Sequence, residues 1–242
     1  MDFTRTEAAQ DLSGLVGTIV DAVCTPQHQR ALDALDERFD TELWSKLIDA
    51  DILSTAAPVS VGGGGFGVLE QVAVLSALGR QLAAVPYLES VVLAAGALAR
   101  FGTAALQQDW AGPAVAGTKI LAVAVDGAAG QGPVQAAAAG DGYRLTGSRV
   151  QVAFAPVADA FLVPAESDSG AALFLVAAND AGVTVTPLQT TGLGSVGELD
   201  LAGVEVSADR VLGDSAALEW LTTLKTLGHT AFQLGVLEPA LE

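Results

Sequence analysis

The stretch PVSVGGGGFGVLEQVAVLSALGR, residues 58–80, allows two interpretations that lead to different folds. Gly62, Gly64 and Gly67 have the spacing G-x-G-x-x-G, which is typical of a loop that holds the pyrophosphate of a dinucleotide. An acidic residue, Glu89, follows about 20 residues later, as that fingerprint requires. Alternatively, the glycines form a turn that lets the chain approach another backbone closely before a helix begins.

The surrounding sequence favours the turn. A dinucleotide loop lies between the first strand and the first helix of a βαβ unit, because the pyrophosphate rests on the N-terminus of that helix. Here helical patterns precede the glycines, Pro58 interrupts any strand before them, and another helical pattern follows. No Lys-Ser or Lys-Thr pair follows Gly67, so the stretch is not a P-loop either. A βαβ fold with a phosphate loop stays open as the lesser alternative.

Outside this stretch, apolar residues recur at helical spacing through the first half of the chain. They form four groups, within residues 12–23, 43–48, 69–78 and 88–98. Asp40 or Thr41 is the expected N-cap of the second group, while Gly79 and Gly102 end the third and fourth. We therefore expect residues 1–112 to form a helical N-terminal domain.

After residue 112 the pattern changes to short β-rich runs separated by glycine and proline. Because these runs have no helices between them, they predict an antiparallel sandwich or barrel over residues 113–213. Helical spacing returns from Ala216, so residues 214–242 are expected to be the first helix of an incomplete C-terminal helical domain. The fold class that we expect is α+β.

Composition narrows the possible functions. The 242-residue chain has 28 acidic residues against 11 Lys and Arg, a net charge of −17 that repels nucleic acids and anionic lipid surfaces. Cys24 is the single cysteine, and His28 and His229 are the two histidines, so we expect neither disulfides nor a metal site. The start MDFTRTEAAQ lacks signal-peptide features, and the apolar run 91–99 is too short to span a membrane. These features favour a cytoplasmic protein.

Segments in three parts of the chain resemble the acyl-CoA dehydrogenase family. Residues 43–90 resemble the N-terminal region of that family, in which a tryptophan helix leads to a Pro-x-x-x-Gly-Gly-x-Gly turn and a helix ending in Gly-Arg. The matching positions are Trp44, Pro58, Gly62, Gly63, Gly65, Gly79, Arg80 and Pro86. Residues 140–165 and 182–213 are similar to the middle β-domain, and GHTAFQLGVLEPALE, residues 228–242, is similar to the first C-terminal helix. In this family the glycine turn is architectural.

The resemblance implies an FAD enzyme that acts on acyl-CoA thioesters. A carboxylate removes a proton α to the thioester while the flavin accepts a hydride from the β carbon. Cofactor-contacting positions of the family correspond to two groups of residues here, Val125-Asp126 and Gln151-Val152-Ala153. The family has a Thr-Glu pair at the first group and a Trp-x-Thr stretch at the second. Both groups therefore lack a hydroxyl, and the second also lacks an aromatic face, so we expect FAD to be bound mainly through backbone groups or only in a complex.

The catalytic base is not identified by the sequence. One branch of the family carries a glutamate before an arginine on the first C-terminal helix, and the register places Lys225-Thr226 there. Lysine cannot replace that carboxylate. Glu219, Glu238 and Glu242 lie on the same helix, but acids on helices are usually solvated. His229 is more often a packed or surface residue than a catalyst.

The last helix also predicts a partner. Its apolar stripe, from Leu218 to Leu237, is wider than one helix can bury alone. In some steroid-degrading members of the resembled family, two unlike chains assemble and one of them supplies the base. We therefore expect activity to need either the further C-terminal helices of the resembled family or association with itself or with another acyl-CoA dehydrogenase-type subunit. We also expect action on fatty-acyl or steroid-side-chain CoA thioesters. The alternative is a non-catalytic scaffold or binding subunit that keeps the fold without the chemistry.

Overall fold

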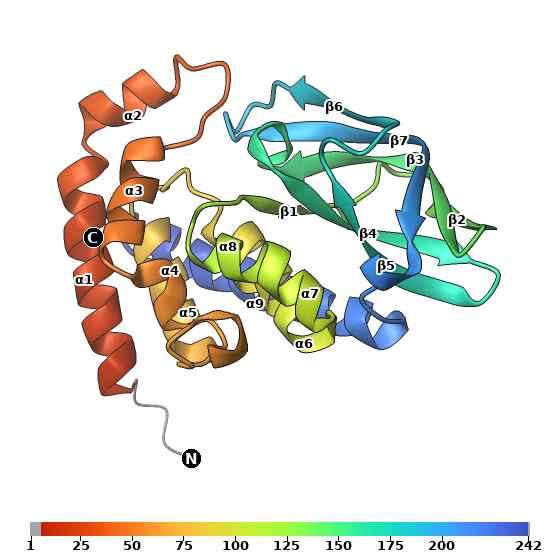
Figure 1. Ribbon diagram of the computed structural model, residues 1–242. Helices are drawn as coiled ribbons and strands as arrows, with labels where there is room; N and C mark the ends of the chain where they lie inside the picture. The colour runs from red at the N-terminus through yellow and green to blue at the C-terminus, as the bar shows by residue number, and fades with distance from the viewer. Residues whose placement is uncertain (1–5, 242) are drawn as a thin grey trace.

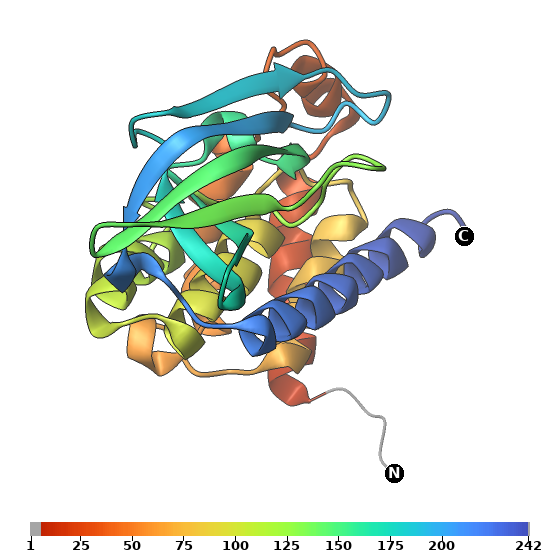
Figure 2. The ribbon, with the colours of Figure 1, turned by 90° about the vertical axis from the view of Figure 1, so that its right-hand side faces the viewer.

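The computed structural model describes residues 6–241, and these residues form a helical part and a curled sheet (Figure 1). The long C-terminal helix α9 (Ser215–Leu237) leaves the sheet and runs back along the helical part (Figure 2). The helical part ends at Val115 and the first strand begins at Leu121, while the division into domains stays a prediction. None of the described helices is long and apolar enough to cross a membrane.

Short helices linked by turns build the helical part. In chain order they are α1 (Glu7–Val23), α2 (Pro26–Leu32), α3 (Thr41–Asp49), α4 (Ile52–Thr55), the 3₁₀ turn η1 (Val59–Val61), α5 (Val68–Gly79), the π-helical η2 (Tyr87–Ala95), α6 (Gly96–Phe101), α7 (Ala104–Leu106), the π-helical η3 (Gln107–Ala111) and α8 (Gly112–Val115). Asp40 caps α3, because its side chain accepts a hydrogen bond from the backbone N–H of Leu43. Of the two expected N-caps, Asp40 and Thr41, the structure uses Asp40.

The glycine stretch that opened the sequence is a turn between η1 and α5. Gly62 and Gly65 have φ of 88° and 77°, the left-handed region that favours glycine. A Cβ at Gly63 would lie 2.1 Å from the carbonyl oxygen of Ala57, so the chain passes too closely there for any side chain. Helices lie on both sides of the turn, and no strand precedes it from residue 6 onward. The dinucleotide interpretation is therefore wrong.

The sheet is mixed rather than wholly antiparallel as expected. Its strands are β1 (Leu121–Val123), β2 (Val134–Ala139), β3 (Gly142–Ala153), β4 (Ala160–Ser167), β5 (Gly170–Ala177), β6 (Val183–Leu188) and β7 (Val196–Ser207). Their order is β1-β4-β2-β3-β7-β6, and β5 pairs with β4. The sequence-adjacent pairs β2–β3, β4–β5 and β6–β7 run antiparallel, and so does the long-range pair β3–β7, whereas β4 lies between β1 and β2 and runs parallel to both. Short connections fix the three sequence-adjacent antiparallel pairs, whereas the β3–β7 pair and the place of β4 depend on long-range packing.

Two hydrophobic clusters fill the molecule. The first joins the helical part to α9 and to one face of β1, β4 and β5, and the second lies inside the curled sheet. Between α5 and α9 the backbones approach closely, because Gly79 and Gly235 leave no side chain at the crossing. The hydroxyl of Ser76 donates to the carbonyl of Ala231 across the same contact, at 3.0 Å. This crossing fixes α9 against the helical part and so positions the residues described next.

Candidate functional site

An ion pair joins α9 to the loop that follows β1. The ammonium of Lys225 donates to a carboxylate oxygen of Asp126, which links the helical part to the sheet side of the molecule. The Lys225 side chain is 20% exposed and that of Asp126 is 56% exposed, so the pair lies at the surface, where α9 meets the loop after β1. Lys225, which the sequence register assigns to the position of the glutamate in one family branch, therefore has a structural partner.

Beside this pair, a cavity of about 170 Å³ lies between α5, η2 and α9. Most of its wall is apolar, with three polar side chains, from Tyr87, Glu89 and His229. The remaining lining residues are Leu75, Leu78, Ala83, Val85, Leu88, Phe154 and Phe232. Tyr87 and Glu89 come from the first turn of η2, and His229 comes from α9, one turn after Lys225. The crossing of α9 over the helical part thus assembles this polar group.

The cavity and the ion pair affect each other's protonation. Burial raises the pKa of Glu89 to about 7, although the positive charge of Lys225 acts in the opposite direction. Burial also lowers the pKa of His229, with a further lowering by Lys225 and an opposing effect of Asp126. The surroundings therefore favour the uncharged forms of both the His229 imidazole and the Glu89 carboxyl.

The five residues predicted to contact FAD lie in different environments. Val152 is 2% exposed and belongs to the core of the sheet, so its side chain is not available to a ligand. Val125 packs against the helical cluster, and the carboxylate of Asp126 is engaged by Lys225. Gln151 is exposed in a strand irregularity at φ 56°, and Ala153 is half-buried. As a set, these side chains do not fit the contacts that the resemblance implies for a flavin ring.

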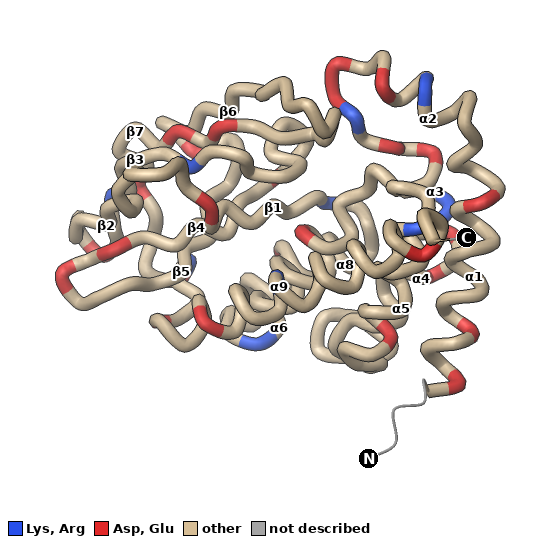
Figure 3. Tube along the Cα trace, turned by 180° about the vertical axis from the view of Figure 1, so that it is seen from behind, with Lys and Arg blue, Asp and Glu red and all other residues tan. Residues whose placement is uncertain are grey.

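Other candidate groups are likewise occupied or dispersed. Glu219 is exposed on α9, and Glu238 pairs with Arg80 at 2.7 Å, while Glu242 lies outside the described residues. Between residues 6 and 241, His, Cys, Asp and Glu side chains form no group of three that could hold a metal ion. Acidic residues are spread over the helical part and the sheet rather than gathered in one patch (Figure 3).

Sequence reasoning considered Glu89 only as part of a dinucleotide fingerprint and missed its place in the cavity. A signal for it was present, because Glu89 is a single acid at the start of an otherwise apolar helical segment, Tyr87–Ala95. An acid in an apolar helical segment either faces solvent or lies in a buried polar site. The spacing of apolar residues does not distinguish these two environments, so the sequence did not predict the place of Glu89.

Comparison with known proteins places the chain in a family. Residues 6–118 match the sequence model of the acyl-CoA dehydrogenase N-terminal domain, and all 242 residues are 72% identical to acyl-CoA dehydrogenase FadE27 of Mycobacterium tuberculosis. The chain belongs to the acyl-CoA dehydrogenase family. It spans 65% of the length of FadE27, so the match covers part of that relative.

Solved structures of the acyl-CoA dehydrogenase family agree with this placement. The crystal structure of the ChsE4-ChsE5 complex from Mycobacterium tuberculosis matches with a TM-score of 0.97 and 72% identity, over 98% of this chain and 65% of the solved one. A steroid acyl-CoA dehydrogenase variant, Tcur3481-Tcur3483, matches with a TM-score of 0.88 and 33% identity, over 96% of this chain and 64% of the solved one. The mixed sheet and its helical part are thus an acyl-CoA dehydrogenase fold.

Proposed function

We propose that this chain is one component of an FAD-dependent acyl-CoA dehydrogenase that acts on fatty-acyl or steroid-side-chain CoA thioesters in the cytoplasm. A second acyl-CoA dehydrogenase-type chain supplies the catalytic base and most contacts to FAD. The observation that carries the proposal is the Lys225–Asp126 ion pair, which occupies the position where one family branch has its catalytic carboxylate.

The chemistry of the pair argues against a catalytic base at this position. Removal of a proton α to a thioester needs a carboxylate or another unprotonated group within hydrogen-bond reach of that proton. A lysine ammonium that donates to a carboxylate has no lone pair with which to accept a proton. The position of Lys225 therefore does not supply the base in the isolated chain.

The size of the cavity gives an independent argument. About 170 Å³ is below the roughly 300–1,000 Å³ that pockets for drug-sized ligands usually have. A steroid nucleus, with four fused rings, is a ligand of that larger class. The cavity between η2 and α9 therefore does not hold a steroid-side-chain substrate, which supports a binding site that the partner chain completes.

The outer face of α9 supports a partner. Thr222, Thr223, Thr226 and Thr230 each donate their hydroxyl to the carbonyl four residues earlier in the helix. The threonine hydroxyls are thus already hydrogen-bonded within the helix. Three exposed leucines lie on α9 as well. These leucines are Leu227, Leu234 and Leu237, which are 41%, 48% and 56% exposed. A helix surface of this kind associates with another apolar surface.

Co-expression with an acyl-CoA dehydrogenase-type partner chain tests the proposal. The purified complex should absorb at flavin wavelengths and reduce a dye in the presence of straight-chain or steroid-side-chain acyl-CoAs, while the isolated chain should do neither. Size-exclusion chromatography run beside the assay should show association. Turnover by the isolated chain at ordinary enzyme rates would contradict the proposal that it lacks the catalytic base. A chain that stays monomeric in the presence of each partner chain would contradict the proposed assembly.

The second candidate function is a non-catalytic scaffold or binding subunit. It is favoured by the poor fit of Val152, Asp126 and Gln151 to a flavin ring. A stable complex that is colourless and inactive with every acyl-CoA would support this alternative over the first. A coloured, active complex would exclude it.

A further inference from the structure

We propose that a second pocket, beside Arg100 and the start of α9, binds an aliphatic monocarboxylate. This Arg100 pocket has a volume of about 490 Å³ and shares no lining residue with the cavity that holds Glu89. The side chains that define its chemistry are those of Phe66, Val68, Val92, Arg100 and Trp220. The pocket belongs to this chain alone, so its occupancy does not depend on the proposed function.

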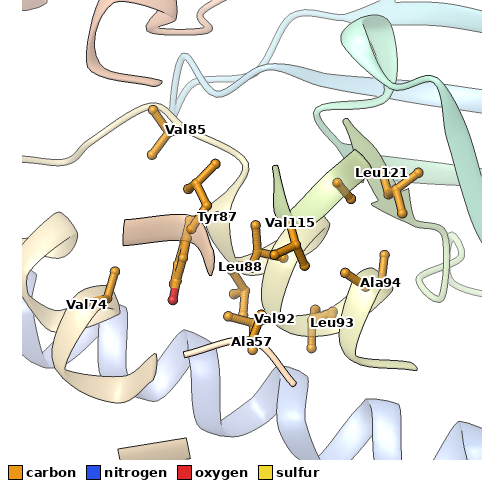
Figure 4. Close-up of a cluster of buried hydrophobic side chains, with 14 of the residues drawn as sticks. Ala57, Val74, Val85, Tyr87, Leu88, Val92, Leu93, Ala94, Val115 and Leu121 are labelled. Carbon is orange, nitrogen blue, oxygen red and sulfur yellow. The ribbon is translucent and has the colours of Figure 1, made fainter. Parts of the chain in front are cut away.

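The wall of the pocket is mostly apolar and partly open to solvent. Phe66 and Val68 line it and are 47% and 43% exposed, and their neighbours Val59 and Leu69 are exposed as well. Apolar side chains that are exposed together mark binding sites, whereas single ones are ordinary. On the inner side, Val92 belongs to the buried cluster drawn in Figure 4, so this wall is part of the packed core.

The glycine turn holds the exposed side of the pocket in place. The backbone N–H of Gly67 donates to the carboxylate of Glu70 at 2.9 Å, and the hydroxyl of Thr6 donates to the same carboxylate at 2.7 Å. These bonds tie the turn to the first turn of α5 and to the start of α1. The turn that carries Phe66 is therefore already ordered, and a ligand pays little conformational entropy to bind beside it.

Arg100 supplies a positive charge that a ligand can reach. Its guanidinium carbon lies 5.4 Å from the ring centroid of Phe101 and 5.8 Å from that of Trp220, so two aromatic rings support it. No acidic side chain between residues 6 and 241 forms an ion pair with it. The Tyr87 hydroxyl is buried without a partner, whereas Arg100 is exposed. Its N–H groups are therefore free to bind a carboxylate in the bidentate manner.

The charges of the pocket and of the whole chain select a ligand with one negative charge. Among the described residues that line the pocket, Arg100 is the only charged one, and the amide of Gln71 already donates to the carbonyl of Ala56 at 3.1 Å. The net charge of −17 repels an anion in proportion to the charge of that anion, while one arginine offsets one charge. A single carboxylate therefore matches the pocket better than a polyphosphate does.

The volume and the apolar wall define the rest of the ligand. About 490 Å³ lies within the roughly 300–1,000 Å³ of pockets that hold small organic molecules. Each CH₂ group that is buried against such a wall strengthens binding by about fourfold. An aliphatic tail on the carboxylate should therefore contribute more to affinity than the exposed charge does.

Binding of octanoate, octanol and butanoate to the 242-residue chain tests the proposal, measured by calorimetry and ligand-observed NMR. Octanoate should bind more tightly than octanol, because the two share a tail and only octanoate pairs with Arg100. Butanoate should bind more weakly than octanoate, by about fourfold for each CH₂ group that no longer contacts the wall.

Variants separate the charge from the wall. Arg100→Gln should weaken octanoate binding about three- to tenfold and leave octanol unchanged, because water screens an exposed pair. Arg100→Lys should keep the preference for octanoate, since it keeps the charge. Arg30→Gln changes an exposed arginine on α2 and is the matched control, which should alter neither affinity. Ala99→Phe adds volume to the wall and should abolish binding of both octanoate and octanol.

Three results would overturn the proposal: wild-type chain that binds octanoate no more tightly than octanol, Arg100→Gln that keeps the preference for octanoate, or Ala99→Phe that binds as well as wild type. Size-exclusion chromatography checks the alternative occupant, a second protein chain. An oligomer that Ala99→Phe dissociates and octanoate does not would show that a second chain fills the pocket, which also overturns the proposal. Circular dichroism of each variant establishes that it is folded before binding is compared.

Discussion

Gly235 of α9 lies directly against Ser76 of α5, so that a Cβ at residue 235 would stand 1.9 Å from the carbonyl oxygen of Ser76. That distance is far inside van der Waals contact, and the obstacle is backbone rather than a side chain that can move. Gly79 meets Phe232 in the same way on the opposite helix, at 2.2 Å. Glycine on both helices therefore allows α9 to pack this closely against α5.

Gly235→Ala should destabilise the chain, because α9 must move away from α5 to admit the methyl group. We expect a loss of about 1–3 kcal/mol in the free energy of unfolding, measured by urea denaturation. Gly14→Ala is the matched control, since residue 14 lies in α1 with nothing within 4 Å of its Cβ position. That control should stabilise α1 by up to about 1 kcal/mol. Equal stability of the two variants would contradict the close crossing.

Glu89 should make stability depend on pH. Burial raises its pKa in the folded protein to about 7 from the ordinary 4.5, so the folded state binds its proton more tightly than the unfolded state does. The contribution of Glu89 to stability should therefore be fully present below about pH 4.5, decrease as pH rises from 4.5 to about 7, and level off above that. Glu89→Gln should remove this fall, which chemical denaturation between pH 5 and 8 measures.

The control for the pH experiment is Glu219→Gln, which changes an exposed carboxylate on α9. It should leave the pH profile of wild type in place. The assignment to Glu89 fails if Glu89→Gln and wild type lose stability in parallel over this range. Lys225, Asp126 and His229 are the charged or titratable neighbours, so the profile should also be compared in Lys225→Met.

The Lys225–Asp126 pair should contribute little to stability. Because Asp126 is more than half exposed, water screens the attraction, and pairs of this kind are worth roughly 0–1 kcal/mol. A double-mutant cycle with Lys225→Met and Asp126→Asn should give a coupling energy in that range that shrinks in high salt. A coupling energy of several kcal/mol, insensitive to salt, would show a far more buried pair than the one described.

Asp40 should be much less replaceable. Its side chain is 1% exposed, caps α3 through Leu43, and accepts from the imidazole of His28 at 2.9 Å. Asp40→Asn turns one acceptor into a donor that faces the histidine, and we expect it to cost about 1–3 kcal/mol of stability. Asp51→Asn is the matched control, because Asp51 precedes α4 without a side-chain cap bond. Thermal denaturation should separate the two variants clearly.

The sequence by itself determined the order of helices and strands, the cap at Asp40 and the turn at Gly62–Gly65. These features depend on residues a few positions apart, and apolar periodicity, cap chemistry and positive φ are local properties. The departures from the family at Lys225 and Ala153 were inferred from the sequence register of the resemblance, and they stay predictions.

Only the tertiary structure decided which distant segments meet. β1 and β4 pair in parallel through Leu121 and Ala160, and no local signal specifies a partner across an intervening hairpin. In the same way, the sequence did not predict that Glu89 and His229 line the same cavity. Only the close crossing of α9 over the helical part brings these two residues together. Periodicity predicts which face of an element is buried, whereas the pKa of Glu89, the partner of Lys225 and the isolation of the Tyr87 hydroxyl arise from packing between elements far apart in the chain.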